Sequence, residues 1–249
     1  RVLAIAVGLP GIVNFKKGVV SKLTNIKGWN NVSLSKILKH KFGVPVFIDN
    51  DANLMALAES RLGAGRGKRN VIGITLGTGV GGGIILNGRL YRGSDFAAGE
   101  IGHMPLNENG PKCNCGGFAC LERYVGNRYI LEEAKKAFKR DITLEETSAL
   151  AKKGNYKAIK LWRNAGLRIG ITLSAVANIL NPDVIVIGGG VAAAGDILLD
   201  SIRNAVKNRA MLPQSRTVRI LKARLGSDAG MIGAGLLAQE ELGKRIIND

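Results

Sequence analysis

The chain has 249 residues, 46% of them hydrophobic, so it can bury the core of one large domain or of two smaller lobes. Its longest apolar runs are strand-sized and interrupted by glycine, which excludes a membrane-spanning helix and predicts a soluble protein. The formal net charge of +17 is compatible with nucleic acid, an anionic membrane surface or anionic small substrates. Because the basic residues form many short clusters with few aromatic residues between them, we do not expect a dedicated nucleic-acid surface.

The first apolar stretch is Val2–Val7, and it follows no charged leader with a cleavage-type site. We therefore expect a chain that is neither secreted nor complete. Further on, strand-like apolar runs alternate with helix-periodic stretches, and most of them stop at glycine. This alternation predicts an α/β protein in which helices cover the sheets.

A strand is predicted over Val44–Ile48, followed by a helix that begins near Asp51 and is capped by Gly63 after Leu62. Asp51 thus lies at a helix entrance, where the helix dipole and free amides keep a carboxylate ionised and able to accept a proton. From position alone, simple helix capping explains the same residue. The segment 63–68, rich in glycine and basic residues, resembles a hinge, and we divide the lobes there.

The next predicted strand, Val71–Leu76, runs into a glycine-rich loop, Gly77–Gly83, and a second strand, Ile84–Leu86, turns at Asn87-Gly88. The five glycines and one threonine of the loop permit positive-φ turns that aim successive amides at a phosphate. The loop is neither a Walker loop nor a dinucleotide fingerprint, because no Gly-Lys-Ser/Thr follows and the next element is a strand. A glycine-rich hairpin without a ligand is the alternative.

A later unit repeats this pattern, since a predicted strand, Asp183–Ile187, leads into three glycines and then a helix over Asp196–Arg209. The glycines serve either a ligand or only a close crossing of helix and strand. The last predicted element, Asp228–Leu242, is a helix rich in small residues that can pack closely on its neighbours.

Four residues have the side chains of a tetrahedral zinc site: His103, Cys113, Cys115 and Cys120, which include every cysteine of the chain. Ordinary buried thiols, or one disulfide with one cysteine left over, are the alternatives. Zinc is preferred because the cysteines lie in a tight loop of asparagine and glycine that can wrap an ion but can hardly build a core. Such a site would be structural and would stiffen the chain between Gly99 and Glu122.

Five segments together resemble the ROK family, which groups repressors, open reading frames and sugar kinases. They are Ile48-Asp49-Asn50-Asp51-Ala52-Asn53, Leu76-Gly77-Thr78-Gly79-Val80-Gly81-Gly82-Gly83, Gly99-Glu100-Ile101-Gly102-His103, Cys113-Asn114-Cys115-Gly116 with Cys120-Leu121-Glu122, and Val186-Ile187-Gly188-Gly189-Gly190-Val191. The resemblance covers essentially the whole chain and implies an α/β actin-like ATPase (ribonuclease H-like) fold with two lobes around a cleft.

The resemblance also implies roles for individual residues. Asp51 would be the catalytic base, and His103 with the three cysteines would bind structural zinc, leaving the other ring nitrogen of His103 for a sugar hydroxyl. The sugar-binding residues would be Asn25, Asn50, Asp51, Glu100, His103 and Glu122. The nucleotide-binding residues would be Gly77, Thr78 and Gly79 at the ATP phosphates and Gly188, Gly189 and Gly190 near the adenosine.

One departure from the family pattern concerns the beginning of the chain. Kinases of this family start with a strand carrying Asp-x-Gly-x-Thr, whose hairpin forms the first phosphate loop and helps to position Mg²⁺, and this chain has no such motif. We therefore expect the first N-terminal hairpin to be missing. The expected lobes are a small one, 1–67, completed by 236–249, and a large one, 68–235, with the zinc loop and the nucleotide-binding glycines.

The activity that the resemblance implies is an ATP-dependent hexose kinase, with glucose converted to glucose 6-phosphate as the first choice. Fructose, mannose, N-acetylmannosamine and N-acetylglucosamine share most of the same machinery. The alternatives are a sugar-sensing ROK-type repressor whose DNA-binding domain is not in this chain, and a bare carbohydrate-binding module. A homodimer or homotetramer, no membrane or nucleic-acid partner, and a cytoplasmic location, which suits metal-bound thiols, complete the expectations.

Overall fold

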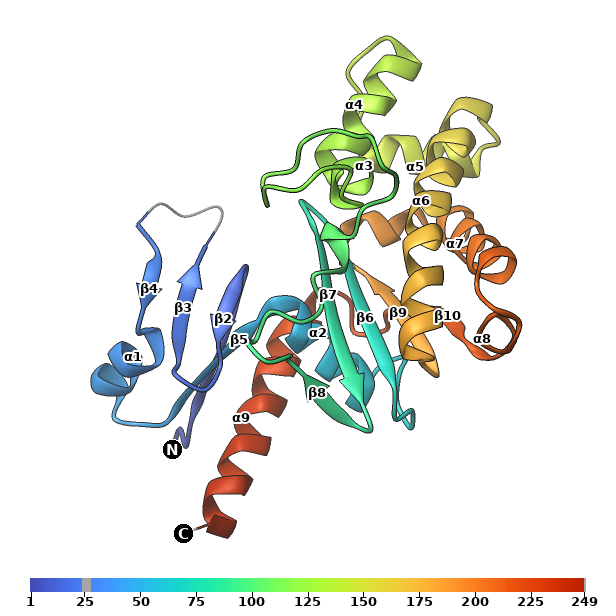
Figure 1. The fold of residues 1–249 in the computed structure, drawn as a ribbon. Coiled ribbons are helices and arrows are strands. Elements are labelled where there is room, and N and C mark those ends of the chain that lie inside the picture. Colours follow the sequence, from blue (N-terminus) through green and yellow to red (C-terminus); the bar gives the residue numbers. More distant parts are fainter. Residues whose placement is uncertain (24–27, 249) are drawn as a thin grey trace.

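The computed structural model describes residues 1–23 and 28–248 of the chain (Figure 1). Its largest sheet has five strands in the order β10 (Arg219–Lys222), β9 (Val184–Gly188), β6 (Val71–Leu76), β7 (Val80–Leu86) and β8 (Arg89–Tyr91). Strand β9 is parallel to both of its neighbours, whereas β6, β7 and β8 are antiparallel and consecutive. The predicted hairpin turn at Asn87-Gly88 is confirmed, with φ values of 51° and 76° that suit Asn-Gly.

The first part of the chain forms two smaller sheets. Strands β1 (Ile5–Leu9) and β5 (Val46–Asn50) are parallel, and β2 (Ile12–Asn14), β3 (Val19–Lys22) and β4 (Asn30–Val32) form an antiparallel sheet. Helix α1 (Leu34–Phe42) packs against β5 and β3. Their shared core holds buried Val13, Val20, Leu34, Val46 and Ile48.

One face of the five-stranded sheet is covered by α6 (Tyr156–Leu180) and α7 (Asp196–Arg209), as Figure 1 shows. Alternate strand residues such as Ile72 and Ile74 of β6 are fully buried against this helical layer, as the period of two in a strand requires. The helices that complete this part are α3 (Glu122–Val125), α4 (Asn127–Phe138), α5 (Leu144–Lys152) and α8 (Leu212–Thr217).

The opposite face of the sheet is covered by α2 (Asp51–Arg61), which packs along α9 (Ala229–Asn248). Val71 of β6 lies on this face and shares one core cluster with Leu54 of α2, Leu237 of α9 and Phe47 of β5. Helices α2 and α9 thus lie between the five-stranded sheet and the β1–β5 pair. The N-terminus of α2 lies where these two sheets approach each other (Figure 1).

Glycine allows α2 to approach its neighbours closely. A Cβ atom on Gly73 of β6 would lie 2.7 Å from the Cβ of Ala56, and one on Gly83 would lie 2.6 Å from the carbonyl oxygen of Ala52. On the other side of the helix, a Cβ on Gly233 of α9 would overlap with the backbone of Leu54. The expectation that the last helix packs closely through small residues is confirmed.

The predicted element bounds need several corrections. The strand expected at Val44–Ile48 is Val46–Asn50, because its ladder with β1 continues to Leu9. The second strand of the glycine hairpin begins at Val80 rather than Ile84, because the glycines pair with β6. The helix cap predicted at Gly63 is Leu62, and α9 runs six residues beyond Leu242, to Asn248. The helix predicted over Asp196–Arg209 has those bounds.

None of the helices within the described ranges combines the length and the apolar composition that crossing a bilayer requires.

The close crossing of α2 and α9 predicts a large effect for Gly233→Ala. The added methyl group would overlap with the Leu54 backbone, and we expect a loss of about 1–3 kcal/mol in the free energy of unfolding. Gly235→Ala on the same helix is the control, because a Cβ there meets nothing within 4 Å and should stabilise the helix by roughly 0.5–1 kcal/mol. Chemical denaturation of both variants measures the difference, and equal effects would contradict the packing argument.

Candidate sugar, nucleotide and metal site

The N-terminus of α2 is capped by Asn50. Its Oδ1 accepts hydrogen bonds from the backbone amides of Ala52 (2.9 Å) and Asn53 (3.3 Å), and its Nδ2 donates to the carbonyl of Gly11 (3.0 Å). Asparagine is a strong N-cap residue because its side chain satisfies free amides of the first turn. Asn50 therefore fills the capping role that position alone suggested for Asp51.

Asp51 is the first residue of α2, and its Oδ1 accepts a hydrogen bond from the amide of Ala52 at 2.8 Å. Although the Asp51 residue as a whole is exposed, protein atoms around its carboxyl group desolvate it in part and raise its pKa above the ordinary aspartate value, and the amide hydrogen bonds lower the pKa by less. The helix terminus was expected to favour the ionised form, but desolvation outweighs it. A higher pKa makes this carboxylate a better proton acceptor.

Asp49, the residue before this pair, is a buried anion that the sequence did not single out. It is 2% exposed and forms an ion pair with Arg92, whose Nη2 lies 2.7 Å from Asp49 Oδ2. Its Oδ1 accepts hydrogen bonds from the Asn50 amide (2.8 Å) and from Nδ2 of Asn53 (2.9 Å). Asp49 thus fixes the backbone from which the Asp51 side chain extends.

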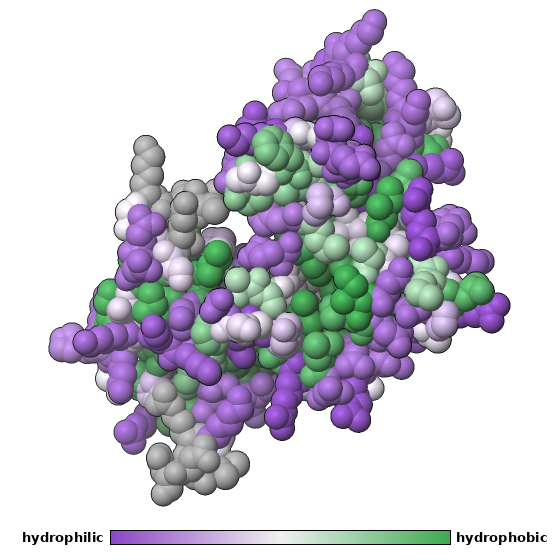
Figure 2. Space-filling view, viewed as in Figure 1, coloured by the Kyte–Doolittle hydropathy of each residue, from purple (hydrophilic) through white to green (hydrophobic). Residues whose placement is uncertain are grey.

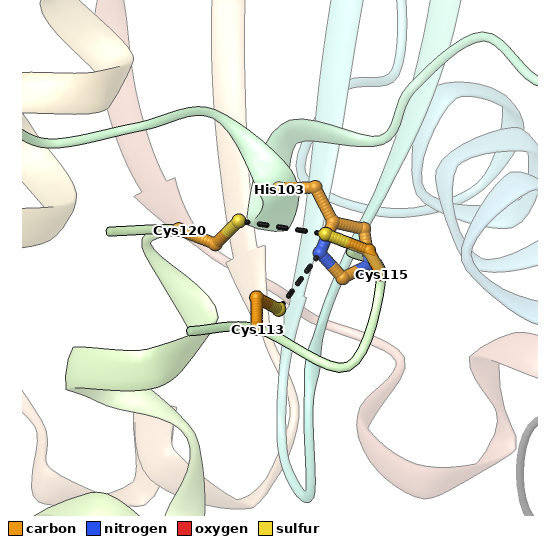
Figure 3. A group of neighbouring side chains, drawn as sticks. All are labelled: His103, Cys113, Cys115 and Cys120. Atoms are coloured by element: carbon orange, nitrogen blue, oxygen red, sulfur yellow. Dashed lines mark hydrogen bonds between the residues drawn. The ribbon is translucent and has the colours of Figure 1, made fainter. Parts of the chain in front are cut away.

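His103, Cys113, Cys115 and Cys120 come together, with one potential ligand atom from each lying within 4.8 Å of the others (Figure 3). Nδ1 of His103 is 3.6 Å from the sulfur of Cys113, and the sulfurs of Cys115 and Cys120 are also 3.6 Å apart. The sequence prediction that these four residues meet is confirmed. In the structure all three cysteines are free thiols, so the disulfide alternative is wrong.

The local fold explains this convergence. His103 ends a short 3₁₀ helix, Ile101–His103, and the cysteine loop folds back so that Cys120 pairs with Pro105. Burial raises the pKa of the Cys120 thiol to about 12, while the backbone amide of Gly117 lowers the pKa of Cys115. A cation that binds these thiols would displace their protons, since only thiolates are good metal ligands.

Glu100 lies beside the other nitrogen of the His103 ring, with His103 Nε2 3.8 Å from Glu100 Oε2. The ring therefore turns Nδ1 toward the cysteines and Nε2 toward the acid. Glu122 opens α3, directly after the cysteine loop, and its Oε2 accepts a hydrogen bond from the amide of Val80 at 3.0 Å. The loop thus places one glutamate at each of its ends.

The two glycine segments expected at the nucleotide lie side by side. Gly188 ends β9, which pairs with β6 next to the turn Gly77-Thr78-Gly79. Gly189 has φ 87°, and a Cβ atom there would overlap with the backbone of Leu76, the residue before that turn. Parallel neighbouring strands end at one edge of a sheet, so both segments face the same edge.

The prediction that the glycines of 77–83 form positive-φ turns around a phosphate is wrong in part. Gly77 and Gly79 adopt no positive φ value, and the other three glycines lie within strand β7. Gly81 and Gly83 face Ala52 of α2. These strand glycines are needed for close helix packing, and only the turn Gly77–Gly79 is left as a loop.

A small pocket of about 30 Å³ joins the two sides of the site, and its lining includes Gly11, Asn50, Phe96, Gly99 and Glu100. In the space-filling view the surface is hollowed between the part built on β2–β4 and the part with the cysteine loop (Figure 2). Among the described residues the structure records no direct contact of Asp51 with Glu100 or Glu122. Asn25 lies outside the described residues.

Comparisons with known proteins agree with this geometry. The ROK family model matches residues 1–241. The glucokinase of Halalkalibacterium halodurans is 36% identical over 254 residues, covering 96% of this chain and 77% of that protein. A putative xylose repressor of Caldicellulosiruptor sp. is 33% identical, covering 93% of this chain and 61% of the repressor. The structure of a ROK family glucokinase from Streptomyces griseus, in complex with glucose and AMPPNP, matches with TM-score 0.87 at 33% identity, covering 96% of this chain and 82% of that one.

The mixed sheets with helices on both faces are those of an α/β protein with the actin-like ATPase fold. Within that class, the chain belongs to the ROK family. The relatives in this family include both a kinase and a repressor, so a member can either phosphorylate a sugar or only bind it.

The raised pKa of Asp51 predicts how Asp51→Asn changes stability with pH. A raised pKa means that folding favours the protonated acid, so this stabilisation is present at low pH and is lost as pH rises through the pKa of the folded state. The variant should therefore have a higher melting temperature than the wild type at pH 7. This difference in melting temperature should shrink toward pH 4. Thermal unfolding at both values is the measurement. A wild type that melts above the variant at pH 7 would contradict the cause given for the shift.

Proposed function

We propose that this protein is an ATP-dependent hexose kinase in which Asp51 is the general base. The observation that carries the proposal is the Asp51 carboxylate, which has a raised pKa and follows the pocket-lining Asn50. Glu100 lines the same pocket as Asn50, and a carboxylate at a pocket suits hydroxyl-rich substrates.

In the reaction, Asp51 accepts the proton of a sugar hydroxyl, most readily the primary one at carbon 6. The hydroxyl oxygen forms a bond to the γ-phosphorus of ATP, and the bond from that phosphorus to the β–γ bridging oxygen breaks, so ADP leaves. Mg²⁺, when bound with ATP, neutralises charge on the phosphates. The protein contributes mainly positioning and exclusion of water, and the base typically contributes about 10²–10⁴-fold.

The sugar would be held by groups on both sides of the pocket. Glu100 is half exposed, and among the described residues Glu122 accepts a recorded hydrogen bond through Oε2 alone, so both carboxylates retain acceptor capacity for hydroxyls. Both polar groups of Asn50 are engaged inside the protein, so its contact with sugar would add to its capping role. The remaining sugar-binding residues in this proposal are Asn25, Asp51 and His103.

The nucleotide would lie at the edge where the two glycine segments meet. Gly77, Thr78 and Gly79 would approach the phosphates, because this turn lies directly beside Gly189 at the end of β9. The adenosine would lie near Gly188, Gly189 and Gly190, and a Cβ atom added at Gly190 would meet nothing within 4 Å. Free space at that glycine suits the approach of a ligand to the backbone.

The cysteine loop would hold a structural Zn²⁺ ion. Three thiols and one imidazole within 4.8 Å of one another match the donor set and closed geometry of structural zinc. His103 would bind through Nδ1 and keep Nε2 for a sugar hydroxyl beside Glu100. The ion would thereby orient a substrate-binding side chain directly.

The lobes would be 1–67 with 236–249, and 68–235. The packing of α9 along α2 and β1 supports the assignment of the C-terminal helix to the first lobe. Homodimer or homotetramer formation is proposed from family resemblance.

A sugar-sensing repressor is the second candidate, because the Caldicellulosiruptor repressor is 33% identical over 93% of this chain, close to the 36% of the glucokinase. A sensor requires a sugar pocket but neither base nor nucleotide. A coupled ADP-release assay of the full-length protein with glucose, fructose, mannose, their N-acetylated amino sugars and xylose separates the two. Phosphorylation of glucose ahead of the others is expected, and sugar binding without ADP release would favour the sensor.

Asp51→Asn tests the base. We expect turnover to fall by at least about 10²-fold, because the proton acceptor is lost. The affinity for sugar, measured by calorimetry, should change little. Asp196→Asn is a matched control, since Asp196 also opens a long helix but has no proposed role. Turnover of Asp51→Asn within a few-fold of the wild type would refute the assignment.

The metal site predicts one zinc ion per folded chain, measured by elemental analysis. Cys113→Ala should lose the metal and much of the thermal stability, because apparent binding free energies of structural zinc reach about 10–16 kcal/mol. His40→Ala is the control, because His40 is the other histidine and lies on exposed helix α1. Stoichiometric zinc in Cys113→Ala, or no zinc in the wild type, would show that these four residues are not a structural zinc site.

A further inference from the structure

Arg92 follows strand β8 and reaches the buried end of β5. Its Nε and Nη2 lie 2.8 Å and 2.7 Å from the same Oδ2 of Asp49, whose side chain is 3% exposed, while that of Arg92 is 16% exposed. The other carboxylate oxygen of Asp49 holds the Asn50 amide and the Asn53 side chain. One ion pair therefore connects Arg92 to the first turn of α2.

The same guanidinium also contacts the antiparallel sheet. Its central carbon lies 3.8 Å from the centre of the Phe15 ring, just after β2, at a distance that suits a cation–π contact. Phe15 packs in turn against the core cluster that contains Phe47 and Leu54. Arg92 thus joins three segments that are distant in sequence.

The backbone of Arg92 fixes the loop that leads to Glu100. Its carbonyl accepts a hydrogen bond from the amide of Ala98 at 3.0 Å, which closes the loop between them. Gly93 and Phe96 within this loop have φ values of 74° and 61°, so a tight, irregular backbone is held in place. Directly after the loop come Gly99 and Glu100, which line the pocket.

We propose that Arg92 is a positioning residue that sets the distance between the two halves of the sugar site, the Asn50-Asp51 end of α2 and the loop that carries Glu100. The proposal rests on the function proposed above. No other ion pair among the described residues links β5 to the segment after β8. Reacting groups on two separate segments need such a link, because a displacement of about 1 Å can lower catalysis by about 10²-fold.

A purely structural role predicts a different outcome from a positioning role. Arg92→Met leaves the Asp49 carboxylate buried without its partner, which destabilises the fold. Adding Asp49→Asn removes that charge and should restore much of the melting temperature. The link between the two halves of the site stays broken in the double variant, so its turnover should stay low if Arg92 acts by positioning, and should recover if Arg92 acts only through stability.

The experiment combines hydrogen exchange and kinetics on the wild type, Arg92→Met and the double variant. We expect faster exchange in Arg92→Met in peptides covering 49–53 and 93–100 together, and kcat/KM for hexose about 10²-fold below wild type in both variants. Arg61→Met is the matched control. It removes an ion pair with Glu240 at the far end of the same helix, so it should lower the melting temperature and leave kcat/KM within about twofold.

Three results would overturn the proposal: unchanged exchange in 93–100, a double variant with wild-type kcat/KM, or an equal kinetic loss in Arg61→Met. If the wild type phosphorylates no hexose, the proposed kinase function fails by that observation alone. Hydrogen exchange and the calorimetric affinity for glucose then test whether Arg92 couples segments 49–53 and 93–100, because these measurements require no turnover. Coupled exchange with a weakened glucose affinity in both Arg92 variants supports it, and independent exchange of the two segments refutes it.

Discussion

The close packing of α2 between the five-stranded sheet and α9 is the constraint on which the site depends. The helix approaches the five-stranded sheet because Gly73 and Gly83 have no side chains where Ala56 and Ala52 need space. It approaches α9 because Gly233 leaves room for the Leu54 backbone. Protein interiors are packed as densely as organic crystals, so a helix held in this way has little freedom to shift. Because Asp51 is the first residue of α2, this packing also fixes its position.

The far end of α2 is fixed by a buried carboxyl group. Glu59 is fully buried and accepts hydrogen bonds from the backbone amides of Ala64 (2.7 Å), Arg224 (2.9 Å) and Leu225 (2.8 Å). A carboxylate can be buried when amides satisfy its oxygens. Glu59 thereby joins the glycine-rich segment after α2 to the chain that enters α9.

The cysteine loop gives the other half of the site comparable rigidity by different means. It is short and poor in apolar residues, so it gains little from hydrophobic burial, and its convergent thiols and imidazole would supply a cross-link through the proposed Zn²⁺ ion instead. Glu100 and Glu122 flank it. Such an arrangement suits sugar recognition in a kinase and in a sensor equally well. The features that favour catalysis are the raised pKa of the Asp51 carboxylate and, separately, the two glycine segments that end at one sheet edge.

Local chemistry was readable from the sequence. The four zinc-type ligands lie within Glu100–Leu121, the turn at Asn87-Gly88 demands residues that accept positive φ, and helix Asp196–Arg209 follows from its apolar period. Each depends on neighbours in the chain, so spacing alone carries the information. The place of Asp51 at a helix entrance was also correct.

Contacts between distant segments follow only from the folded structure. Asp49 and Arg92 are 43 positions apart and Glu59 and Arg224 are 165 apart, and no local pattern marks either pair. The strand glycines of β7 look like a phosphate loop in the sequence, but packing against Ala52 and Ala56 accounts for Gly81 and Gly83. Asn50 rather than Asp51 caps the helix, and desolvation rather than the helix terminus sets the direction of the Asp51 pKa shift. The order of residues fixes which chemical groups are available, whereas the fold fixes which of them meet and how far water is kept from them, because burial and long-range contact depend on the whole chain.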